Sequence, residues 1–247
     1  MENLSDPTAG EVRVAASLPM AAGILPVIVD RLSRRHPRIA IHAREVPIGL
    51  LQFQTPTYRD LRERAVDLVL GPIVALRTAE DLETELLFSD TLIVATGKQN
   101  RWIRRRAVKL RDLIDEPWCL PSPDTPAGLR CVEAFRLNGL DVPTRNVTSL
   151  SLHLQLGLLA TQRFFTMFPG SLMRFGADRL SIKGLPIKLA VQPIPVGIIT
   201  LKDRTISPAA QLFIQVVWTI KPTLNRNNEG PGFCPGLLFL CSRCDHV

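Results

Sequence analysis

The first forty residues constrain the fold more than any other part of the chain. Residues 12–16 predict a short strand that ends at Ser17, and residues 23–36 predict a helix because their apolar side chains recur at helical spacing. Pro37 ends that helix, and residues 39–46 predict a second strand. A strand, helix and strand in this order predict a parallel sheet, in which small ligands lie at the carboxyl ends of strands. Ser17 is therefore the first candidate binding residue.

The remainder of the chain continues this alternation. We predict further strands at residues 67–71, 91–96, 118–120, 147–150 and 196–201, and helices at residues 54–65, 127–138, 152–161 and from Ser207 onward. Residues 164–168 form an apolar run that ends at Pro169-Gly170. The pattern favours an α/β fold with mainly parallel strands. From Asn225 the chain loses any helical or strand period and becomes rich in Gly, Pro and Cys, which predicts a tail outside the fold.

Composition narrows the class of protein. The chain has 247 residues, of which 46% are hydrophobic and 21% charged, as in globular proteins with a substantial core. Its net charge is +7, and residues 101–111 hold six basic residues in eleven. That run is either a phosphate-binding patch or a solvated loop and helix start, and we favour the second reading. The polar first ten residues and the short apolar runs predict a cytoplasmic protein without a membrane partner.

The cysteines and the motif search point away from catalysis. Cys119 and Cys131 lie in apolar settings and are expected in the core. Cys234, Cys241, Cys244 and His246 could in principle bind zinc, but their spacing is cramped, so we predict no metal and no cofactor. The chain has no G-x-S-x-G, H-E-x-x-H or G-x-x-x-x-G-K-[ST] motif, and we predict that it is not an enzyme.

Several landmarks, in the right order, resemble one family. They are Gly10 to Arg13, Leu25-Pro26, His36 to Ile39, Asp67 to Gly71, Leu92 to Val94, Leu110 to Leu113, Phe135 with Gly139, Ser149, Phe168-Pro169 and Ser207 to Ala210. Over roughly residues 10–220 the chain resembles the effector-binding (substrate-binding) domain of LysR-type transcriptional regulators. Where that family shows a glycine-rich turn before the equivalent of Phe168-Pro169, this chain has the bulky pair Phe164-Phe165.

The resemblance implies a two-lobed, type 2 periplasmic-binding-protein-like fold with a ligand cleft between the lobes. Lobe one would comprise residues 10–88 plus 203–221, lobe two residues 89–202, and residues 222–247 would form the tail. The partners implied are a small-molecule effector and a second copy of the chain, paired through helices 23–36 and 127–138. DNA would be bound only through a helix-turn-helix module, which we expect to be absent because nine residues precede Gly10.

Matching positions to the family gives the expected effector-binding residues. They are Ser17, Leu18, Pro19, Ile48, Gly71, Pro72, Ser122, Thr125, Ser149, Phe165 and Thr166. Hydroxyls and backbone N–H groups at strand ends can hold an anionic or sugar-like metabolite without a fixed cation. The sequence thus predicts the effector-binding and dimerisation domain of a LysR-type regulator. The alternatives are a stand-alone solute-binding protein of the same fold and a decayed regulator fragment that binds nothing.

Overall fold

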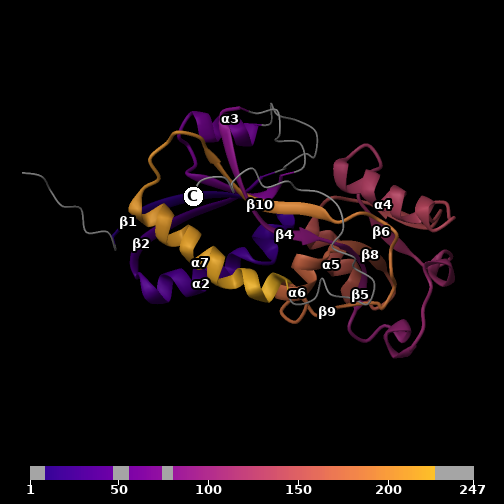
Figure 1. Cartoon of the computed structure of the whole chain (residues 1–247). Helices are drawn as coiled ribbons and strands as arrows, with labels where there is room; N and C mark the ends of the chain where they lie inside the picture. The colour runs from indigo at the N-terminus through magenta and orange to yellow at the C-terminus, as the bar shows by residue number, and fades with distance from the viewer. Residues whose placement is uncertain (1–8, 47–55, 74–79, 226–247) are drawn as a thin grey trace, which may run out of the picture.

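A computed structural model of the chain describes residues 9–46, 56–73 and 80–225. The described residues form two five-stranded sheets, which lie side by side in an elongated molecule (Figure 1). The first sheet has the strand order β2-β1-β3-β10-β4, with β1 (Ala9–Ser17), β2 (Arg38–Val46), β3 (Leu68–Pro72), β4 (Leu82–Asp90) and β10 (Ile194–Leu201). The second has the order β7-β6-β8-β5-β9, with β5 (Leu92–Gly97), β6 (Trp118–Leu120), β7 (Asn146–Thr148), β8 (Phe165–Pro169) and β9 (Ile182–Gly184).

Helices cover both faces of each sheet. On the first sheet, α1 (Leu18–Ala22), α2 (Leu25–Arg35) and α7 (Pro208–Asn225) cover one face and α3 (Pro56–Arg62) the other. On the second sheet, α4 (Pro126–Leu137) covers one face, and α5 (Leu152–Ala160) and α6 (Gly170–Gly176) cover the other. Two short 3₁₀ helices, η2 (Arg101–Arg104) and η3 (Leu110–Leu113), connect β5 to β6. The α/β class is as predicted, but the expectation of mainly parallel strands is wrong. β10 runs antiparallel to β3 and β4, and β5 runs antiparallel to β8 and β9, so both sheets are mixed.

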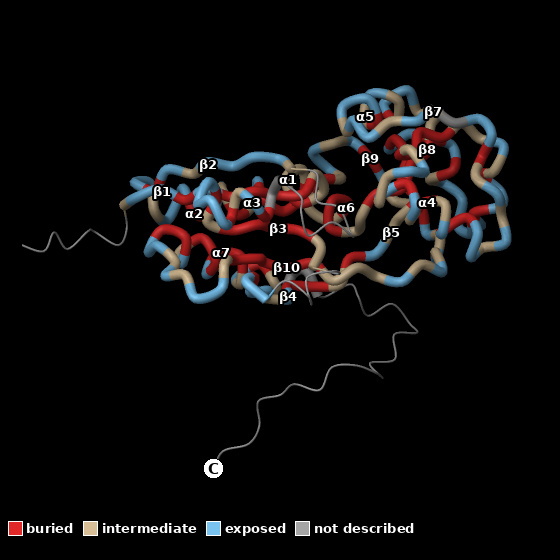
Figure 2. The backbone as a smooth tube through the Cα atoms, turned by 90° about the horizontal axis from the view of Figure 1, so that it is seen from above, coloured by how far each residue is buried: buried red, intermediate tan, exposed pale blue. Residues whose placement is uncertain are grey.

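The core of the first sheet follows the two-residue period of its strands. Val12, Val14 and Ala16 of β1 pack toward α2 and α7, whereas Ala15 between them packs toward α3. The middle strand β3 is buried, and the edge strand β2 is largely exposed (Figure 2). The apolar face of α2 supplies Leu25, Ile28 and Leu32 to this core.

The core of the second sheet is built around an aromatic cluster. The Trp118 and Phe135 rings meet edge to face with centroids 5.2 Å apart, and Phe165 lies 5.6 Å from Trp118. The indole N–H of Trp118 donates to the carbonyl oxygen of Leu113 at 2.9 Å, so this buried polar group is satisfied. Cys119 and Cys131 are buried, as expected. Burial raises the pKa of the Cys131 thiol to about 12, so this thiol remains protonated at neutral pH.

One strand lies in a different lobe from the one expected. We expected residues 89–202 to form lobe two, but β10 (Ile194–Leu201) pairs antiparallel with β3 and with β4 in the first sheet. In the first sheet β3 and β4 are not neighbours, and β10 lies between them and supplies hydrogen bonds to both. The second lobe therefore ends before Ile194. Helix α7 also runs to Asn225, beyond the expected limit at residue 221.

Candidate functional site

Ser17 is the last residue of β1 and directly precedes α1. Its side chain is only 6% exposed, yet its hydroxyl makes no cap hydrogen bond to α1 and has no hydrogen-bond partner among the described residues. A buried hydroxyl without a partner is unusual, because its desolvation is not compensated. Leu18 and Pro19 follow it and are partly buried. Pro19 has no N–H, so the first turn of α1 offers one donor fewer than we expected.

The end of β3 lies beside Ser17. Ala16 pairs with Leu70 in parallel register, so the next residues along the two strands, Ser17 and Gly71, are neighbours at the same edge of the sheet. Gly71 and Pro72 pair with β10 on their other side. The structure thus brings these predicted site residues of the first lobe together. Ile48 lies outside the described residues.

In the second lobe, Ser122 and Thr125 belong to the turn that opens α4. The Thr125 hydroxyl donates to the carbonyl oxygen of Ser122 at 2.6 Å and accepts from the backbone N–H of Gly128 at 3.1 Å, so it acts as the helix N-cap. A Cβ at position 128 would lie 1.8 Å from that same carbonyl oxygen, which is why a glycine stands there. The Thr125 hydroxyl therefore already has its hydrogen-bond partners within this turn, whereas Ser122 is partly exposed.

Ser149 follows β7 and lies near the same edge of the second sheet. Its backbone N–H donates to the carbonyl oxygen of Leu120 at 2.9 Å, which joins the ends of β6 and β7. Its hydroxyl accepts from the backbone N–H of Ser151 at 3.0 Å. Since a hydroxyl can also donate, Ser149 keeps a hydrogen atom for a ligand.

Phe165 and Thr166 lie in the core and not at the edge. Both are fully buried in β8, where Phe165 packs on Trp118 and the Thr166 hydroxyl donates to the carbonyl oxygen of Cys119 at 2.7 Å. Their expected contact with a ligand does not agree with this placement. The strand runs three residues further to Pro169, so its carboxyl end is formed by Pro169 and Gly170.

The two carboxyl edges face one another across the junction between the sheets. Helix α6, which follows β8, packs on α1, which follows β1, and the Arg179 guanidinium donates to the carbonyl oxygen of Ala22. Both helices lie at the centre of the molecule (Figure 2). Because α1 begins directly after Ser17 and α6 begins directly after Pro169, the ends of β1 and β8 approach each other.

Asp90 joins the end of β4 to the start of α6 at this junction. It was not among the predicted site residues. It is 7% exposed at the end of β4, and its carboxylate accepts from the backbone N–H of Ser171 at 2.9 Å and from the Ser171 hydroxyl at 2.5 Å. Burial raises the pKa of Asp90, while these hydrogen bonds and the charges of Arg174 and Arg130 oppose the rise. The only signal in the sequence is an isolated carboxylate between two apolar runs, at residues 86–96.

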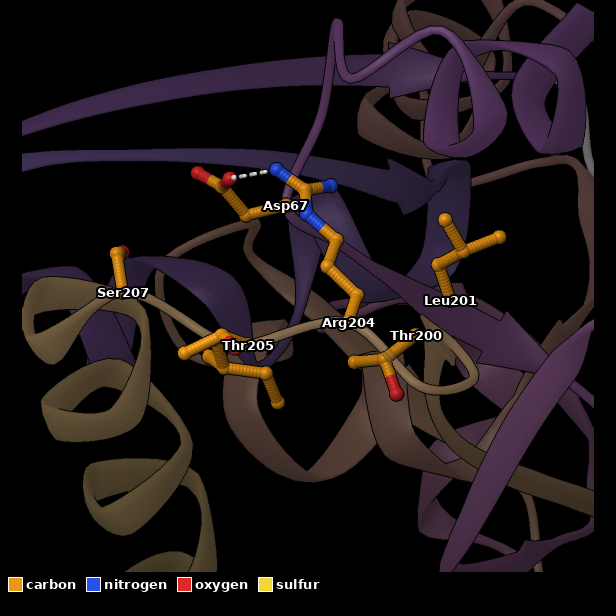
Figure 3. A pocket seen from close by; sticks show the side chains of 7 residues that line it. Asp67, Thr200, Leu201, Arg204, Thr205 and Ser207 are labelled. Atoms are coloured by element: carbon orange, nitrogen blue, oxygen red, sulfur yellow. Dashed lines mark hydrogen bonds and ion pairs between the residues drawn. The ribbon is translucent and has the colours of Figure 1, made fainter.

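A small cavity lies at the opposite end of the first sheet. Its volume is about 100 Å³, and it is lined by Asp67, Thr200, Leu201, Arg204, Thr205, Ile206 and Ser207 (Figure 3). Arg204 pairs with Asp67 at 3.2 Å and donates to the carbonyl oxygen of Val66 at 3.3 Å. These contacts tie the loop before α7 to β3, so we assign the cavity a structural role. No predicted site residue lies there.

Metal and membrane sites receive no support from the described part of the chain. Within it, no three His, Cys, Asp or Glu side chains are grouped as metal ligands would be. The cysteines of the expected tail lie outside the described residues. Among the helices described, none combines the length and apolar character needed to cross a bilayer.

The chain thus forms two α/β lobes whose strand ends face each other, which is the arrangement of two-lobed, periplasmic-binding-protein-like folds. The solved structures that resemble the chain include the BenM effector binding domain with its effector benzoate, with a TM-score of 0.63, 21% identity, and coverage of 94% of this chain and 99% of that one. Another is the effector binding domain of QuiR in complex with shikimate, with a TM-score of 0.59, 19% identity, and coverage of 87% and 98%. The expected two-lobed, periplasmic-binding-protein-like fold is thereby confirmed.

The sequence comparisons identify the family. Residues 5–219 match the LysR substrate binding domain, and the chain belongs to that family. It is 26% identical over 202 residues to the HTH-type transcriptional regulator GalR of Pseudomonas putida, covering 81% of this chain and 49% of that protein. It is 22% identical over 213 residues to the transcriptional dual regulator GltC of Bacillus subtilis, covering 86% and 68%. The chain thus spans about half the length of the first of these relatives.

Proposed function

We propose that the facing strand ends bind a small-molecule effector, and that the chain is the sensing and dimerising part of a cytoplasmic transcription regulator. We favour binding over catalysis, because among the described site residues the hydroxyls of Ser17, Ser122 and Ser149 have no histidine or carboxylate as a hydrogen-bond partner. DNA would be bound by a helix-turn-helix module of the regulator that lies outside the residues described. The site that we retain consists of Ser17, Leu18, Pro19, Gly71, Pro72, Ser122 and Ser149.

The Ser17 hydroxyl is the observation that supports this proposal most directly. It is buried at the end of β1 and has no partner among the described residues, so a ligand oxygen at this edge would supply a hydrogen bond. The effector is an anionic or sugar-like metabolite that presents such an oxygen. Benzoate and shikimate, which the BenM and QuiR domains bind, are both carboxylates, and this favours a carboxylate here.

A thermal-shift screen tests the proposal. The full chain is melted against aromatic acids, sugar acids, amino acids and sugar phosphates, and one class is expected to raise the midpoint in a dose-dependent way. Each ligand found is then titrated against Ser17→Ala, which should lower affinity about tenfold by removing one hydrogen bond. Thr166→Val is the matched control and should leave affinity unchanged, because its hydroxyl lies in the core.

The outcomes separate the alternatives. A chain that melts cooperatively but responds to no class would contradict effector binding and indicate a decayed fragment. Binding by a chain that remains monomeric at high concentration would instead indicate a stand-alone solute-binding protein. Equal affinity loss in both variants would remove Ser17 from the site.

Dimerisation is the second part of the proposal. Helix α4 exposes Leu129 and Leu137, which are 53% and 51% exposed. Of the apolar residues of α2, Leu25, Ile28 and Leu32 lie in the core, whereas Val27 and Val29 are only partly buried. We therefore place the contact on α4 of one copy, against the exposed edge strand β2 and the outer face of α2 of the second copy.

A further inference from the structure

The basic segment, residues 101–111, is held rigidly on the surface of the second lobe. It contains η2 and the start of η3, between β5 and β6 (Figure 1). The Asn100 side chain accepts from the backbone N–H of Trp102 at 2.9 Å and donates to the carbonyl oxygen of Gln162 at 2.9 Å. The indole N–H of Trp102 donates to Glu116 at 3.0 Å, and Val108 is buried. The segment is therefore anchored to the lobe on both sides of Arg104, Arg105 and Arg106, whose side chains are exposed.

Five of its cations have no acidic partner within the described part of the chain. Arg101 pairs with Glu116, whereas no ion pair is formed by the remaining five, which are Arg104, Arg105, Arg106, Lys109 and Arg111. All five are exposed. Of the nearby acids, Glu116 is engaged by Arg101 and Trp102, Asp112 caps the backbone N–H of Lys109 at 2.9 Å, and Asp115 is exposed.

The density of its cations distinguishes this segment from the rest of the described surface. Elsewhere, some exposed arginines pair with nearby carboxylates, as Arg34 does with Asp30 and Arg59 with Glu63, and unpaired ones such as Arg145 do not lie in a run of basic residues. In the basic segment, like charges lie well within one Debye length, about 10 Å at 0.1 M salt, and repel each other. Such a cluster gains free energy when an anionic partner neutralises it.

We propose that the basic segment binds the phosphate backbone of duplex DNA without reading its sequence. Arg105 has an extended backbone, with φ −81° and ψ 131°. Arg104 ends η2, and Arg105 and Arg106 follow it directly, so three exposed guanidinium groups are presented from consecutive positions. The planar N–H fork of a guanidinium matches phosphate oxygens, which is why arginine is favoured for phosphate recognition.

The surface chemistry favours DNA over an acidic protein. Protein interfaces have an apolar centre, whereas protein–DNA interfaces are polar and strongly basic. None of the exposed large apolar side chains in the described residues belongs to the basic segment, because Trp102, Val108 and Leu110 are buried. The contact adds DNA affinity to a domain whose effector site lies elsewhere, so it does not depend on the proposed effector.

Fluorescence anisotropy of the full chain with a labelled duplex of about 20 base pairs, across about 50–200 mM salt, tests this contact. Five phosphate contacts would give a slope of log K against log salt of about −4.5. The triple variant Arg104→Ala, Arg105→Ala, Arg106→Ala should reduce the magnitude of that slope by about 3. The control Arg145→Ala, Lys183→Ala, Lys188→Ala removes three charges from exposed, dispersed positions and should change the slope by less than about 1.

Three results would overturn the proposal. The first is no binding of the wild-type chain at the lowest salt. The second is an equal loss in both triple variants, which would indicate a net-charge effect. The third is competition by a poly-glutamate peptide as effective as that by unlabelled DNA of equal charge, which would indicate an acidic protein partner. Circular dichroism melts of both variants verify that each remains folded.

Discussion

Removal of the Ser17 hydroxyl is expected to stabilise the protein without ligand, because this hydroxyl has no hydrogen-bond partner in the part of the chain that the structure describes. A Ser N-cap normally stabilises its helix by about 0.5–2 kcal/mol, and its replacement by Ala is then costly. That cost is not expected at Ser17, because its side chain makes no cap hydrogen bond. What remains is the desolvation of a hydroxyl that is 6% exposed and has no partner among the described residues.

The magnitude follows from that desolvation. Burying an unpaired hydroxyl costs roughly 1–3 kcal/mol in protein mutational data. Ser17→Ala should therefore raise the free energy of unfolding by about 1 kcal/mol, taking the lower end because a few per cent of the side chain still meets solvent. For a chain of this length, that raises Tm by about 2–4 °C.

Thr166→Val is the comparison that isolates the effect. Its hydroxyl is also buried but has a partner, the carbonyl oxygen of Cys119 at 2.7 Å, so its loss should lower the free energy of unfolding by about 1 kcal/mol. Both variants are measured by calorimetry and urea denaturation without ligand. A fall in Tm for Ser17→Ala of the size seen for Thr166→Val would refute the reasoning, because it would mean that the Ser17 hydroxyl is hydrogen-bonded in the empty protein.

Two further predictions concern the junction and the dimer. Burial raises the pKa of Asp90 in the folded protein above its ordinary value of 3.8. Below pH 3.8 the carboxyl is protonated in the folded and the unfolded protein, and its contribution to the free energy of unfolding is complete. This contribution declines as the pH rises through the higher pKa of the folded state. Asp90→Asn should therefore lose less stability than wild type as the pH is raised above about 4 in urea denaturation, and identical pH profiles would contradict the assignment. Leu129→Glu should convert a dimer to a monomer in sedimentation experiments, while Leu86→Glu, at a position 48% exposed on β4, should not. An unchanged mass for Leu129→Glu would exclude α4 from the interface.

The sequence predicts strands well where apolar residues alternate or cluster, as at β1 and β3. It missed β4, because this edge strand carries the exposed Glu83 and the partly exposed Glu85 and its apolar residues do not alternate regularly. It also missed α6, whose seven residues are too few for a helical period to emerge. The lobe of β10 could not be predicted, because an apolar run does not tell which sheet it joins.

The site was predicted best where a strand end is marked by a turn residue. Ser17 precedes Leu18-Pro19, and Gly71 precedes Pro72, so both strand ends could be located to within a residue. In β8 the residues are buried on both faces, and such a run does not reveal where its carboxyl end lies. Phe165 and Thr166 were therefore placed at the edge although they belong to the core. Asp90 acts through a contact with Ser171, eighty-one positions away, that local patterns do not encode.

The position of β10 has a consequence for how the chain folds during synthesis. Val69 of β3 pairs with Ile199 of β10, so the first sheet is completed only after the whole second lobe has been made. The second lobe, in contrast, is continuous and can close its own core earlier. Pairings so distant in sequence slow folding and leave apolar strands uncovered in the meantime. The amino-terminal strands are therefore the part of the nascent chain most exposed to aggregation and most dependent on chaperones.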